Sequence, residues 1–211
     1  MKSIKIAGLC LVALAAMAMA TTATASATPV WEQLNGTTWS EIKGTEKVID
    51  AGTLKLTDTK GGLTGGVVTV ECSGTSTGTV GPGKYDRITT ITVANPCRNI
   101  TGCVGTIKAE ARNLPWQTEL FETEGKVRDS VVSEVAGKFP GWKVECTLSD
   151  TCEGNTTTAI VNNTSNNTVE AVFDAKSAVV TCSRGGAGTG KVEGTNIIKE
   201  NESPFTGVRV S

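Results

Sequence analysis

The stretch VTVEC at residues 68–72 alternates apolar and polar side chains, which places Val68, Val70 and Cys72 on one face. Residues 53–57, TLKLT, alternate in the same way. A period of two is that of a β-strand with one buried face. The two stretches therefore predict strands of an all-β protein.

The same pattern extends along the chain, with Gly or Asn breaks about every 8–12 residues. Further candidate strands lie at residues 87–93, 116–120, 142–146, 169–173, 180–182, 192–198 and 208–210. Only residues 130–136 are expected to form a helical turn, which Gly137 and Pro140 would stop. Many short strands with Gly-rich turns favour a disulfide-stapled β-sandwich or distorted barrel.

The N-terminus has the features of a secretory signal peptide. Lys2 and Lys5 precede an apolar run over residues 6–19, and small-residue cleavage motifs end near Ala25 and Ala27. A membrane-spanning helix needs roughly 20 apolar residues, so this run is too short to be one. We expect the segment to be cleaved on export.

Cleavage leaves two parts, a signal peptide at residues 1–27 and a single all-β domain at residues 28–211. The chain has 20 Lys and Arg against 21 Asp and Glu, and the signal removes two lysines, which leaves 18 − 21 = −3. A mildly acidic protein does not attract polyanions, so nucleic acid is not an expected partner. We predict an extracellular protein with no membrane span in the mature chain, either released or held non-covalently at the cell surface.

Six of the seven cysteines follow the signal peptide, and an even number in an exported chain predicts three disulfides. Six cysteines allow fifteen connectivities. Two pairs of cysteines have only five residues between their members, which favours local bridges within each pair. The remaining two cysteines would then form one long-range bridge. Zinc motifs usually space cysteines by about two to four residues, so a metal site is not expected. The favoured pairs are Cys97/Cys103, Cys146/Cys152 and Cys72/Cys182.

The absence of histidine excludes Ser-His-Asp and Cys-His catalytic sites. Residues 185–191, GGAGTGK, approach a phosphate-binding loop, but Val192 stands where Mg²⁺ needs a hydroxyl, so a Gly-rich β-turn is expected. Glu119, Glu122 and Glu124 could supply a glycosidase carboxylate pair, yet a solvated strand end is the expected role. We therefore assign no catalytic, cofactor-binding or metal residue.

Two tryptophans are candidate ligand contacts. Trp31 and Trp39 flank Asn35-Gly36, a hairpin-type turn, and exposed indoles there could stack on sugars. Trp116 and Trp142 alternate with apolar residues and are expected in the core, beside a disulfide.

One loop is a weaker candidate for calcium. The Asn-rich residues 162–167 together with Asp150 could hold Ca²⁺, but no spaced Asp-x-Asp pattern supports such a site. It is not part of the predicted site.

Several motifs resemble a group of uncharacterised secreted proteins from soil actinobacteria. The resemblance spans roughly residues 50 to 200, in keeping with one domain, and implies a bacterial, extracellular protein. It implies no activity and carries over no site residue. The motifs are VECSGT at residues 70–75, VGPG at 80–83, NLPWQTEL at 113–120, GKVRD at 125–129, PGWKVEC at 140–146 and CSRGGAG at 182–188.

These observations favour a non-enzymatic extracellular or cell-surface protein that binds an extracellular protein or glycan, or has a structural role. A carbohydrate-active module, binding or hydrolysing polysaccharide through Trp31, Trp39 or the glutamates at 119–124, is the first alternative. An inhibitor of extracellular hydrolases is the second, since disulfide-held β-loops present rigid surfaces.

Overall fold

The computed structural model describes residues 28–174, 177–201 and 205–211, and the predicted signal peptide lies outside them. These described residues form sixteen β-strands and no helix, which confirms the all-β prediction. The strands are β1 (Trp31–Asn35), β2 (Thr38–Glu41), β3 (Glu46–Asp58), β4 (Val68–Val80), β5 (Tyr85–Val93), β6 (Arg98–Thr101), β7 (Ile107–Arg112), β8 (Trp116–Thr123), β9 (Lys126–Ser133), β10 (Gly141–Cys146), β11 (Asp150–Thr156), β12 (Thr158–Asn163), β13 (Val169–Phe173), β14 (Ala178–Cys182), β15 (Gly186–Glu200) and β16 (Val208–Val210).

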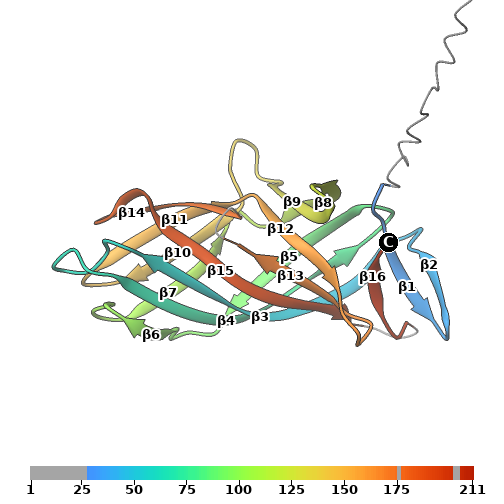
Figure 1. Cartoon of the computed structure of the whole chain (residues 1–211), viewed down its shortest axis with the longest axis horizontal. Helices are drawn as coiled ribbons and strands as arrows, with labels where there is room; N and C mark the ends of the chain where they lie inside the picture. Colours follow the sequence, from blue (N-terminus) through green and yellow to red (C-terminus); the bar gives the residue numbers. More distant parts are fainter. Residues whose placement is uncertain (1–27, 175–176, 202–204) are drawn as a thin grey trace, which may run out of the picture.

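Eight of these strands close into an antiparallel barrel, which is the barrel alternative of the predicted fold class. Their order is β13-β12-β9-β8-β5-β4-β3-β15, and β15 then pairs with β13 to close the circle. The alternating stretches at residues 53–57 and 68–72 lie in β3 and β4, which pair along their full lengths. Figure 1 shows β3, β4 and β15 running along the long axis of the molecule.

The long strand β15 belongs to both the barrel and a second group of strands. Its last part, around residues 194–198, pairs with β13 and closes the barrel. Its first part, residues 186–190, pairs with β14, and the sheet continues through β11 and β10 to β7. The strand β6 adds to β4 on the same half of the molecule. The barrel therefore extends into a curved sheet at one end.

A separate small sheet, in the order β16-β1-β2, lies at the other end of the molecule (Figure 1). The predicted hairpin at Asn35-Gly36 joins β1 to β2, with Asn35 opposite Thr38. The sheet packs on the barrel through a buried apolar cluster that includes Trp31, Val80 and Leu120. Burial of this cluster holds the small sheet over the barrel end.

The six cysteines form three disulfides, as predicted, but the favoured pairing is wrong. The bridges are Cys72–Cys97, Cys103–Cys146 and Cys152–Cys182. Strand neighbours decide the pairing, not closeness in sequence. Cys152 and Cys182 are direct partners of β11 and β14, and β6, which follows Cys97, pairs with β4 next to Cys72. All three bridges lie in the core of the curved sheet.

One local prediction also fails. Residues 130–136 do not form a helical turn, because residues 130–133 are the end of β9, which pairs with β8 and begins its pairing with β12. Tertiary pairing overrides the local preference here. None of the described residues forms a helix of the length and hydrophobicity that crossing a bilayer would require.

Candidate functional site: the barrel interior

A cavity of about 100 Å³ lies inside the barrel. Alternate residues of a strand point to opposite faces, so one set of side chains from each barrel strand lines it. From β3 these are Val48, Asp50, Leu54 and Leu56. Most of the lining is apolar, as is usual for pockets that bind small molecules.

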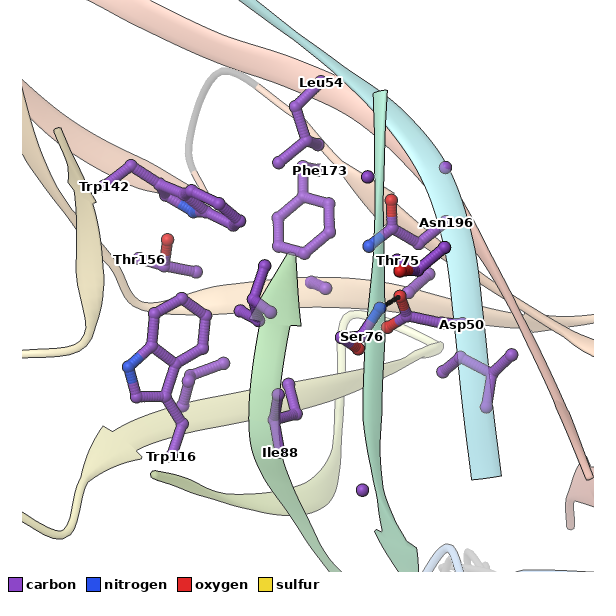
Figure 2. A pocket seen from close by; sticks show the side chains of 18 of the residues that line it. Asp50, Leu54, Thr75, Ser76, Ile88, Trp116, Trp142, Thr156, Phe173 and Asn196 are labelled. Carbon is purple, nitrogen blue, oxygen red and sulfur yellow. Dashed lines mark hydrogen bonds between the residues drawn. The ribbon is translucent and has the colours of Figure 1, made fainter. Parts of the chain in front are cut away.

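One side of the cavity is aromatic. The rings of Trp116 and Trp142 meet edge to face, with centroids 5.7 Å apart and an interplanar angle of 84°. Figure 2 shows both indoles on one side of the pocket and Phe173 between them and the opposite side. The prediction that Trp116 is a core residue is confirmed, since it is 2% exposed. Flat apolar surfaces of this kind suit a ring or a short hydrocarbon chain.

The opposite side is polar and acidic (Figure 2). The backbone N–H of Ser76 donates to Asp50 Oδ1 at 3.1 Å, and the side chains of Ser76 and Asn196 also hydrogen-bond to this carboxylate. Burial raises the pKa of Asp50, and these hydrogen bonds act against the rise. Gly52 faces Asn196 in the β3–β15 register, and a Cβ atom there would overlap the Asn196 amide. Glycine thereby lets the amide lie beside the carboxylate.

Two more aspartates line the cavity near the small sheet. Burial raises the pKa of Asp86 to about 7, and the hydrogen bond that the Trp31 indole donates to this carboxylate acts against the rise. Burial and the neighbouring Asp86 charge together raise the pKa of Asp129 well above its ordinary value. Two buried carboxyl groups in such proximity cannot both ionise easily, so the pair holds a proton near neutral pH.

No basic side chain balances these acids inside the barrel, as far as the described residues show. Arg87 contributes to the lining but is exposed, and its guanidinium binds Glu134 on the outside at 2.8 Å. The interior therefore disfavours anions and favours hydrogen-bond donors or cations.

Three polar atoms of the lining residues are unsatisfied. Asp129 Oδ1, Trp142 Nε1 and Thr156 Oγ1 are buried without a hydrogen-bond partner in the described protein. An unpaired buried polar group costs roughly 1–3 kcal/mol, so a molecule that paired with it would recover that free energy. The cavity thus combines apolar walls with a small number of polar groups, as binding pockets do.

The predicted contact residues Trp31 and Trp39 do not form an exposed pair. Trp31 is 0% exposed, because β1 packs its face onto the barrel end, so the expectation that its indole is exposed is wrong. Trp39 is partly exposed, and the guanidinium of Arg209 lies over its ring at 4.5 Å. The two indoles therefore do not offer a joint stacking surface.

The other sequence candidates also lie outside the cavity. Glu119 forms an ion pair with Lys84, and Glu122 and Glu124 are exposed on the β8–β9 hairpin. The Gly-rich residues 185–191 lie at the turn and first residues of β15, as expected for a β-turn.

The sequence analysis missed the polar residues of the interior, although one signal was present. Asp50 shares the even-numbered positions of Leu54 and Leu56, so in a strand it must point to the apolar face. A charged residue at a position that faces the apolar side of a strand indicates a buried polar site. Asn196 and Asp129 carry no such local signal, because their neighbours do not alternate as clearly.

No protein-family model, no curated protein and no solved structure matches this chain.

Proposed function

We propose that this chain is a non-enzymatic extracellular binding protein that takes a small, mainly apolar molecule into its barrel. The observation that carries the proposal is the cavity of about 100 Å³ with an aromatic side and an acidic side. An apolar cavity of about 150 Å³ is known to hold benzene, so a ligand on the scale of one ring suits this space.

The polar side narrows the chemical class of the ligand. Asp50, Asp86 and Asp129 all line the cavity, and each is an acceptor when ionised. A ligand with an amine or hydroxyl on an apolar body would place its donor at Asp50 and its body against Trp116 and Trp142. A carboxylate ligand would meet like charge and is disfavoured.

The extracellular assignment rests on two independent features. The chain begins with a segment that predicts export, and its three disulfides suit an oxidising compartment. Binding to a polysaccharide has less support, because Trp31 is buried and Arg209 covers one face of Trp39.

Calorimetric titration of the secreted, oxidised protein tests the proposal, with benzylamine, benzyl alcohol, toluene and benzoate as ligands. We expect affinity to fall in that order, with no binding of benzoate. Asp50→Asn keeps the shape and should weaken benzylamine binding about tenfold or more, since a charged hydrogen bond contributes roughly 1.5–3 kcal/mol. Toluene binding should change little in this variant.

Glu193→Gln removes an exposed carboxylate from the neighbouring strand β15 and serves as the matched control. It should bind all four compounds as the parent protein does. Absence of binding by benzylamine, benzyl alcohol and toluene alike would refute the proposal.

A further inference from the structure

A second pair of buried carboxylates lies outside the barrel interior, where three turns meet. Asp58 is the last residue of β3, and Asp150 is the first residue of β11. Asp58 is 0% exposed and Asp150 is 5% exposed. Their carboxylates belong to a cluster whose atoms all lie within 4.8 Å of one another. The cluster lies at the end of the molecule opposite the β16-β1-β2 sheet (Figure 1).

One oxygen of Asp150 is fully hydrogen-bonded and the other is not. Oδ1 accepts from the Ser183 hydroxyl at 2.8 Å and from the backbone N–H groups of Thr151 and Arg184 at 2.9 and 3.2 Å. Cys152 Sγ lies 3.3 Å from Oδ2. That sulfur is bridged to Cys182 and carries no hydrogen, so it cannot donate. Oδ2 therefore has no N–H or hydroxyl donor. Burial raises the pKa of Asp150, and the neighbouring Asp58 carboxyl adds to the rise.

Asp58 has the same asymmetry. Its Oδ1 accepts from the backbone N–H of Lys60 at 2.9 Å, whereas its Oδ2 is buried without a hydrogen-bond partner in the described protein. No ion pair with a described Lys or Arg neutralises Asp58 or Asp150. A buried carboxylate oxygen without a donor or counter-charge is costly, and proteins usually pair such atoms or bind a metal with them.

The two oxygens without an N–H donor both lie beside Gly61. A Cβ atom on Gly61 would lie 2.5 Å from Asp150 Oδ2 and 2.8 Å from Asp58 Oδ2. A Cβ atom on Gly185, from the β14–β15 turn, would lie 2.5 and 2.6 Å from the Asp58 oxygens and would overlap Thr189 Oγ1. Two glycines therefore border the carboxylates where any side chain would fill the space.

We propose that Asp58 and Asp150 bind a hard divalent cation, with Ca²⁺ as the ion that their chemistry suits. Carboxylate oxygens are ligands that Ca²⁺ prefers, and Thr189 Oγ1 borders Gly185 on the same side as the Asp58 oxygens. The neighbouring sulfurs are oxidised and offer no thiolate, which disfavours zinc. The ion would tie the β3–β4 turn to the starts of β11 and β15. This site is separate from the barrel cavity, so the proposal does not depend on the ligand proposed above.

Thermal unfolding of the oxidised protein in EDTA and in rising CaCl₂ tests this site, with NaCl at equal ionic strength as the salt control. A ligand that binds only the folded state raises the unfolding midpoint in proportion to its saturation. We expect a saturable rise with CaCl₂ and none with NaCl. Calorimetric titration with CaCl₂ should give one site per chain.

Asp58→Asn and Asp150→Asn should each weaken Ca²⁺ binding about tenfold or more, because the charge count of the ligands sets affinity. Both variants remove like-charge repulsion, so they should fold in EDTA at least as well as the parent protein. Glu153→Gln, an exposed position on the same strand as Asp150, should keep the full response. Equal unfolding midpoints in EDTA and in CaCl₂ would overturn the proposal. Asp58 and Asp150 would then share a proton and bind no ion. A full calcium response in Asp58→Asn would overturn it as well.

Discussion

Trp31 donates its indole N–H to Asp86 Oδ1 at 3.3 Å, across 55 residues of sequence, and both side chains are buried. This bond joins the first strand of the small sheet to β5 of the barrel. It places the small sheet over the barrel end and the Asp86–Asp129 pair beneath it. The fold of the N-terminal hairpin and the electrostatics of the cavity are therefore linked.

Replacing Trp31 by Phe keeps an apolar ring and removes the donor. Asp86 would then lose a partner in a buried position, so the free energy of unfolding should fall by roughly 1–3 kcal/mol, with some further loss of packing. Urea denaturation measures the change. Trp39→Phe on the neighbouring strand is the control, and a loss below about 1 kcal/mol is expected there, since this ring is partly exposed beneath Arg209. Equal losses in the two variants would contradict a specific role for Trp31.

Stability should fall as pH rises from about 4 to about 7. The pKa of Asp86 increases from an ordinary value of 3.8 to about 7 in the folded protein, so between these values the folded chain holds a proton that the unfolded chain has lost. The free energy of unfolding therefore decreases from about pH 4 to about pH 7. The raised pKa of Asp129 acts in the same direction.

Asp86→Asn tests this pH dependence, because it is neutral at every pH and keeps an oxygen acceptor for Trp31. Urea denaturation at about pH 5, 6.5 and 8 should show a shallower slope in the variant than in the parent protein. Glu193→Gln should leave the slope unchanged, as its side chain is exposed. A parent protein whose stability rises over this range would refute the assigned direction.

Filling the cavity should remove binding without unfolding the protein. Ala171 on β13 is buried, lines the cavity and is the strand partner of Asn196 on β15. Ala171→Leu therefore places three more carbon atoms in the space that the ligand would occupy. Calorimetry should show loss of benzylamine binding, while stability changes by less than about 2 kcal/mol in either direction. Ala51→Leu makes the same change on the exposed face of β3 and should bind normally. Retained binding in Ala171→Leu would place the ligand elsewhere.

Peptide mapping without reduction should recover Cys72–Cys97, Cys103–Cys146 and Cys152–Cys182. The Cys103→Ser/Cys146→Ser double variant opens the longest loop, of 43 residues, and should lose about 4 kcal/mol by the chain-entropy relation. Recovery of a Cys97–Cys103 peptide would contradict the strand arrangement around β6.

The strands were predictable because alternation is local. Residues 53–57 and 68–72 contain enough of the pattern to identify the strands that became β3 and β4. The disulfide pairing was not predictable, because Cys152 meets Cys182 only once β11 has paired with β14. Sequence separation gives no information on such pairings.

The candidate site was less predictable than the fold. The burial of Trp31 depends on where a hairpin docks, which its own residues do not specify. The cavity depends on eight strands closing on one another, and the meeting of Asp50 with Asn196 requires β3 and β15 to be neighbours. Only Asp50 carried a local signal, because it is a charged residue on the apolar face of its strand.

The central claim is that a small ligand occupies the barrel interior between the tryptophan wall and Asp50. The indole N–H resonances of the four tryptophans in a ¹⁵N-labelled protein test it directly during titration with benzylamine. The signals of Trp116 and Trp142 should move saturably, with the same dissociation constant, while that of Trp39 stays in place. Movement of the Trp39 signal alone, or no movement of any indole signal, would contradict binding inside the barrel.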